Sequence, residues 1–149
     1  MPNTVSFKLT GADQIQDKLN RLPSEYSRRA LRVGVRAGGK VLLDEVRHLA
    51  KRLTGWMAEQ AYVRVKTNNL DQGSAHVSLS SRLNPESGAP AIYEALWKEF
   101  GVPRHGISAQ PFIRPAFESK KQDAIDATIA KLREALDVFK SLNRAWRST

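Results

Sequence analysis

Apolar and polar positions alternate near the start of the chain. Residues 4–10 have a period of two, which predicts a half-buried strand. Apolar residues then recur at spacings of four and three from Ile15, which predicts a short helix closed by Pro23. The chain therefore opens with a strand followed by a helix.

A much longer helix is predicted from Ser24, whose hydroxyl can cap the first turn, to about Leu53, with Gly55 ending it. Its apolar positions fall on one face, which we assign to the core: Leu31, Val35, Gly38, Leu42, Leu49 and Leu53. The same helix contains Gly34, Gly38 and Gly39, and each glycine costs about 1 kcal/mol relative to alanine in a helix interior. Either a close approach of another backbone or a kink would explain them.

Two further alternating segments, 59–67 and 74–82, flank a stretch rich in turn-forming residues. They predict an antiparallel hairpin. A polar loop then leads into a short helix over 91–100 and an irregular segment over 101–110, which carries two glycines and a proline. Residues near 107–113 are a candidate for a fourth strand.

The C-terminal part predicts an amphipathic helix of about 30 residues that begins near Pro115. Its apolar stripe consists of Phe117, Ile125, Ile129, Leu132, Leu136, Phe139 and Trp146. Trp146 lies at the far end of this helix, where neighbours within the chain run out. Its side chain is therefore a candidate for a contact with another molecule, and packing at the edge of the core is the alternative.

Together these elements predict an α+β fold in a single domain, residues 1–149. We expect an antiparallel sheet of about four strands, with the long basic helix and the C-terminal helix packed on one face.

The chain is strongly basic. It contains 24 Lys and Arg residues but only 15 Asp and Glu residues, which gives a net charge of +9. Most of the excess lies between residues 18 and 52. One face of the long helix collects Arg29, Arg32, Arg36, Lys40, Arg47 and Lys51. Such a face suits DNA phosphates or an acidic partner protein. A solvated face whose long side chains cover neighbouring apolar surface is an equally open interpretation.

Candidate chemistry is sparse. The chain has no cysteine, and His48, His76 and His105 are scattered over a helix, a strand and a loop, so no metal site is expected. No pair of carboxylates, nucleophilic serine motif or phosphate-binding loop is apparent, so we expect neither an enzyme nor a cofactor. No secretory signal and no apolar run of about 20 residues is present, so a soluble protein without a membrane partner is expected.

One group of residues resembles a family motif. It comprises Tyr93, Glu99-Phe100-Gly101 and Gln110-Pro111-Phe112-Ile113-Arg114-Pro115-Ala116, with a further match at Thr54-Gly55-Trp56-Met57. This pattern is similar to that of the gene-product-ten-like morphogenesis family of lambdoid tailed bacteriophages. In that family a tyrosine leads into Glu-Phe-Gly-Thr, and Pro-Phe-Leu-Arg-Pro-Ala opens the last helix. Val102 replaces the threonine here, and Ile113 replaces the leucine.

The motif also has a physical logic of its own. Pro111 and Pro115 restrict the backbone on both sides of Phe112, Ile113 and Arg114, so that Phe112 or Ile113 can plug the core. Arg114 would face a carboxylate, and Glu99 is the nearest candidate. We therefore predict a Glu99–Arg114 ion pair that holds the intervening loop at both ends. The predicted structural anchor consists of Glu99, Phe100, Gly101, Pro111, Phe112, Arg114 and Pro115.

The resemblance implies a structural virion protein, made in the host cytoplasm and built into the neck or tail as a tail-completion or head-tail joining component. It implies a ring of identical subunits, and six copies would match a sixfold tail. Other neck and tail proteins would be its partners, with DNA in the channel. A tail terminator or a head-closure (stopper) ring is the alternative within this class. From other classes, a non-specific nucleic-acid-binding protein and, less well supported, a small hydrolase or nuclease remain open.

Overall fold

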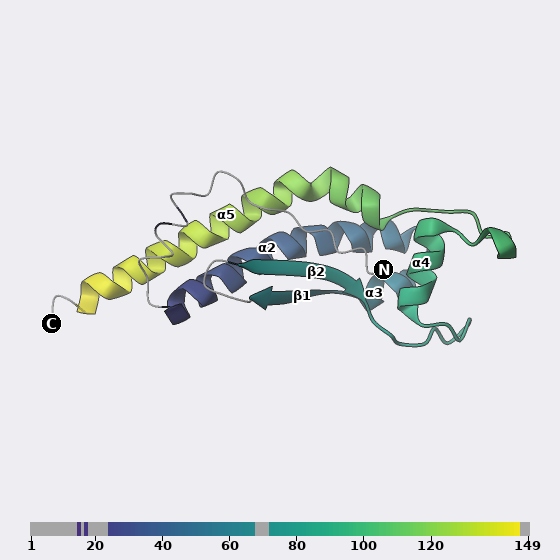
Figure 1. Ribbon diagram of the computed structural model, residues 1–149, viewed down its shortest axis with the longest axis horizontal. Helices are drawn as coiled ribbons and strands as arrows, with labels where there is room; N and C mark the ends of the chain where they lie inside the picture. The colour runs from purple at the N-terminus through teal and green to yellow at the C-terminus, as the bar shows by residue number, and fades with distance from the viewer. Residues whose placement is uncertain (1–14, 16, 18–23, 68–71, 147–149) are drawn as a thin grey trace. The chain divides into compact units, whose positions relative to one another are not determined.

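The computed structural model describes residues 15, 17, 24–67 and 72–146, with the side chains of 15, 17, 25–67 and 72–141 (Figure 1). Its elements, in chain order, are α2 (Ser24–Lys51), α3 (Gly55–Gln60), β1 (Ala61–Thr67), β2 (Gly73–Leu79), α4 (Ala91–Phe100), a 3-10 helix η1 (Pro103–His105) and α5 (Ile113–Trp146). The predicted α+β class is confirmed. The prediction that both long helices pack on one face of the sheet stays a prediction.

The sheet is smaller than predicted. In the described residues it is one antiparallel pair, β1 and β2, and the predicted strand over 4–10 lies outside them. The candidate strand over 107–113 is wrong. Val102 and Ile107 bond to each other within a tight loop, at 2.8 and 3.2 Å, and α5 already begins at Ile113. Because this loop pairs with itself, it offers no extended segment to a third strand.

The role of Gly55 was also predicted wrongly. Helix α2 ends at Lys51, and Gly55 begins α3 instead of following a helix end. The physical reason is Thr54, whose backbone is extended and whose Oγ1 accepts the amide of Met57 at 3.2 Å. A side-chain cap of this kind starts a new helix. The short helix α3 therefore occupies the first residues of the predicted strand, and β1 starts at Ala61.

The other helices agree closely with the predictions. Helix α4 has the predicted bounds. Helix α5 is 34 residues long and begins two residues before Pro115, which therefore lies in its first turn. Ser24 is the first helical residue of α2, whereas it was predicted to precede that helix as the cap.

The described residues belong to two compact units, and α2, α5 and the hairpin each contribute to both. The first unit comprises the described parts of Met1–Gly39, Val65–His76 and Asp123–Thr149. The second comprises Lys40–Arg64 and Val77–Gln122.

In the first unit, α2 and α5 pack together at two glycines. A Cβ atom on Gly34 would lie 2.5 Å from Cγ of Leu132, and one on Gly38 would lie 2.6 Å from the carbonyl oxygen of Ala124 and clash with Oγ1 of Thr128. Of the two explanations for the helix glycines, close approach of another backbone is therefore correct at these positions. The core beside this contact contains Ile15, Ala30, Leu132 and Leu136.

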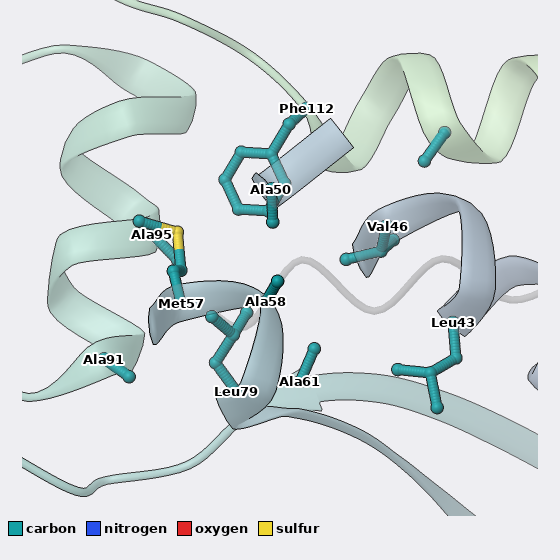
Figure 2. Packing of buried hydrophobic residues seen from close by; sticks show 11 residues of the cluster. Leu43, Val46, Ala50, Met57, Ala58, Ala61, Leu79, Ala91, Ala95 and Phe112 are labelled. Atoms are coloured by element: carbon teal, nitrogen blue, oxygen red, sulfur yellow. The ribbon is translucent and has the colours of Figure 1, made fainter. Parts of the chain in front are cut away.

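The second unit has its own apolar core, in which small and large side chains meet (Figure 2). Its members come from every α-helix of the unit, from both strands and from the segment before α5: Leu43, Val46, Ala50, Met57, Ala58, Ala61, Leu79, Ala91, Ala95, Phe112 and Ala116. Phe112 and Met57 are its largest fully buried side chains. Of the two residues predicted to plug the core, Phe112 does so, and Ile113 packs partly buried against it.

Candidate functional site

The residues of the family-like motif meet at the start of α5, in the second unit. The Glu99 side chain, which is only 7% exposed, accepts three consecutive backbone amides. Its Oε2 binds the amides of Phe112 and Ile113 at 2.8 and 2.9 Å, and its Oε1 binds that of Arg114 at 3.2 Å. First-turn amides have no partner within their own helix and carry partial positive charge. A carboxylate from α4 therefore caps α5.

This geometry corrects the predicted Glu99–Arg114 ion pair. The Arg114 side chain is exposed, and no ion pair joins it to Glu99 in the described structure. Glu99 instead accepts a hydrogen bond from the backbone amide of Arg114. Because α5 begins at Ile113, free amides point at Glu99 and satisfy both carboxylate oxygens. Glu99 still holds the loop over 101–110, as expected, but with a different donor.

The other end of that loop is also tied. The backbone amide of Gln110 donates to the carbonyl oxygen of Lys98 at 2.6 Å. The backbone amide of Gly101 donates to the carbonyl oxygen of Trp97 at 2.7 Å. Gly101 has φ +71°, and a Cβ there would lie 2.8 Å from the carbonyl oxygen of Ile107. Only glycine fits this position. Among the remaining anchor residues, Pro111 and Pro115 are exposed, and so is Phe100, which does not join the core.

Helix α4 has an unusual surface that the sequence analysis missed. Its buried positions are Ala91, Ala95 and Glu99. Every exposed position carries a large apolar side chain, namely Ile92, Tyr93, Leu96, Trp97 and Phe100, between 38% and 54% exposed. We call these five residues the α4 face. They span one continuous arc at 100° per residue. The helix thus has two alanines and a glutamate inside and large apolar residues outside.

The borders of the α4 face are fixed by hydrogen bonds. Glu94, on the flank of the helix, accepts both contacts of the Asn84 amide at 3.0 and 3.1 Å and one from the Ser87 hydroxyl. Glu99 is occupied by the amides of α5. Both of these carboxylates of α4 therefore have hydrogen-bond partners away from the α4 face. The same bonds hold the helix in place near both of its ends.

The predicted basic face is only partly free. In the first unit, Arg29, Arg32 and Arg36 are exposed, and in the second unit so are Lys40 and Lys51. Arg47 differs, because it is half-buried and its Nη2 donates to the carbonyl of Ala61 at 2.7 Å, while its Nε is buried without a partner. This arginine ties α2 to the start of β1 and is not a free cation as predicted.

An open cavity of about 620 Å³ lies beside Arg47. Its lining is Asp44, Arg47, His48, Lys51, Ala58 and Glu59. Two carboxylates and two obligate cations balance one another there, so the cavity has no strong preference for an anion or a cation.

The remaining candidates occupy varied positions. Trp56 packs half-buried against the core of the second unit, Trp97 belongs to the α4 face, and the side chain of Trp146 lies outside the described ones. In the described parts of the chain, no three histidine or acidic side chains gather as metal ligands would. None of the described helices combines the length and apolar character needed to cross a membrane.

The sequence contains one feature from which the α4 face could have been predicted. Most positions around the predicted helix 91–100 are apolar, which is normally found in helices that are buried on all sides. Because this helix of ten residues has a polar loop on either side, any side that the core leaves open exposes large apolar side chains. Compared with protein-family models, with curated proteins and with solved structures, the chain has no match.

Proposed function

We propose that this chain is a structural subunit of a tailed bacteriophage, a neck or tail-completion component that forms a ring at the head-tail junction. The observation that carries the proposal is the capping of α5 by Glu99. Several of the residues that resemble the phage family motif are joined here: Glu99 binds the backbone amides at the start of α5, Phe112 lies in the core, and Gly101 has a positive φ with no room for a Cβ atom. Such a unit holds loops in place and offers no reactive group.

The proposed role needs surfaces rather than a catalytic centre. A ring subunit contacts its neighbours laterally and other layers axially. The described structure provides an uncharged apolar surface on α4 and exposed cations along α2. In the proposed setting the cations face DNA in the channel or acidic neck and tail proteins, and a hexamer would match the symmetry of the tail. A tail terminator or a head-closure ring would use the same features.

The proposal is tested by locating the chain in virus particles. Antibodies against the purified chain should label tailed particles from an infected culture of the host that makes it, at the junction of head and tail. Immunogold electron microscopy shows whether the chain lies at this junction, and a particle map at side-chain resolution separates a neck component from a terminator or stopper. A chain that is abundant in uninfected cells and absent from all particles would rule the proposal out.

A non-specific nucleic-acid-binding protein is the second candidate, and the exposed arginines of α2 favour it. The two functions differ in assembly state. A nucleic-acid-binding protein of this kind would bind duplex DNA as a monomer with a steep dependence on salt. A ring subunit would be incorporated into particles, whatever affinity for DNA it has on its own.

A further inference from the structure

The α4 face exposes enough apolar surface for a contact with another molecule. At about 200 Å² for each large side chain, its exposed fractions leave about 400 Å² of apolar surface open to water. A contiguous apolar patch of this size on a soluble protein usually marks a contact with another molecule. A standard interface takes about 800 Å² from each partner, and roughly half of that is apolar. The α4 face supplies about that apolar share.

The composition of the α4 face suits a protein contact. It contains one tryptophan, one tyrosine and one phenylalanine, the types that dominate binding energy at protein interfaces. Their helix is held in place by the bonds of Glu94 and Glu99, so little conformational freedom would be lost on binding. The absence of cations among the five residues argues against an anionic surface as the partner.

Charge points to the identity of that partner. Two copies of a chain with a net charge of +9 repel each other, and they can approach most easily through a surface that carries no cation. All exposed positions of α4 satisfy this condition. An uncharged apolar surface can also pack against another apolar surface without burying an unpaired charge. An acidic partner, in contrast, would be drawn to the exposed arginines and lysines of α2.

We infer that the α4 face is the surface through which one copy of this chain contacts a second copy. The inference deepens the proposed function, on which it rests, by naming the surface that each subunit offers to its neighbour. Because the contacts around a ring are head-to-tail, the neighbour meets the α4 face with a different surface of its own. It assigns the exposed cations of α2 to other partners.

The test uses the full chain and measures its association by sedimentation velocity across about two orders of magnitude in concentration. The wild type should associate, and added salt should preserve or strengthen this association, because salt screens the repulsion between the copies. Trp97→Lys should raise the dissociation constant tenfold or more. Tyr93→Ser should weaken association without any change of charge.

Val138→Lys is the matched control, because Val138 is 52% exposed on α5 and the substitution adds the same charge. It should leave association unchanged. Circular dichroism should show that all variants are folded, since none of the substituted side chains belongs to a core.

The inference is overturned by a wild-type chain that stays monomeric, by a Trp97→Lys variant that associates normally, or by equal weakening in Val138→Lys. These outcomes are independent of the immunogold result. A monomer found at the head-tail junction would remove this contact and leave the proposed function standing, whereas an associating chain absent from particles would do the reverse.

Discussion

Oε2 of Glu99 accepts the amide proton of Phe112 at 2.8 Å, and the side chain of Phe112 is itself 2% exposed in the core of the second unit. One short segment thus receives a polar anchor through its backbone and an apolar anchor through its ring. The polar anchor joins α4 to α5, and the apolar anchor joins the start of α5 to the core. Stability and the position of the α4 face therefore depend on the same few atoms.

Replacing the carboxylate should reveal this dependence. Glu99→Ala leaves three amides without their acceptor, and we expect it to lower the free energy of unfolding by about 2 to 4 kcal/mol. Glu99→Gln keeps one oxygen and should cost about half as much. Urea denaturation measures both. Arg114→Ala should change stability by less than about 0.5 kcal/mol, because its side chain is exposed. If Arg114→Ala lowered the free energy of unfolding more than Glu99→Ala does, the predicted ion pair between the two side chains would be supported instead.

Gly38 should not tolerate alanine despite its position in a helix. The added methyl group gains about 1 kcal/mol of helix propensity, but it meets the backbone of Ala124 at 2.6 Å. We expect a net loss of about 2 kcal/mol from the forced separation of α2 and α5. Thermal unfolding measures it. Gly55→Ala is the control, since no atom lies within 4 Å of its added Cβ, and it should be neutral or stabilising. Equal effects at both positions would contradict the close approach of the helices.

The two positive-φ glycines of the loop after α4 should differ in their response. Gly101→Ala combines an unfavourable backbone conformation with a clash against Ile107 and should cost about 3 kcal/mol. Gly106→Ala has φ +66° but open space around its Cβ, so about 1 kcal/mol is expected. Urea denaturation of both variants measures these losses, and the difference between them gives the cost of the clash at Gly101. If Gly106→Ala were the more damaging of the two, the packing described for this loop would be incorrect.

The exposed arginines of α2 should control binding to polyanions. Replacing Arg29, Arg32 and Arg36 by glutamine should weaken binding to duplex DNA and reduce the slope of log affinity against log salt by about 2 to 3. Fluorescence anisotropy at several salt concentrations measures the slope.

The matched control for this prediction replaces Lys131, Arg133 and Lys140 of α5 by glutamine. It removes the same charge, but two of these cations already lie near carboxylates, Lys131 at 2.6 Å from Glu134 and Lys140 at 3.7 Å from Asp137. The slope should change little. If the control lowered it equally, net charge rather than the face of α2 would govern binding.

Two of the wrong sequence predictions, on Gly55 and on Arg114, share one cause. Gly55 was expected to end a helix because glycine commonly does so, but the Thr54 hydroxyl and the Met57 amide start another one. Ion pairing was assigned to Arg114 because its charge is visible in the sequence, whereas the backbone amides that bind Glu99 exist at every residue. In each case the deciding partner was a backbone group whose availability depends on where a helix begins.

Helical periodicity alone determined α4 closely and α2 and α5 to within about two residues, apart from the distal end of α5. Composition alone determined the basic charge and the absence of cysteine. These properties are set by neighbours three or four residues apart, or by simple counting. Only the tertiary structure decided that α5 lies against Gly38, that Glu99 caps α5, and that α4 has its aromatic side chains outside. Those results depend on contacts between segments far apart in the chain, which local spacing does not specify.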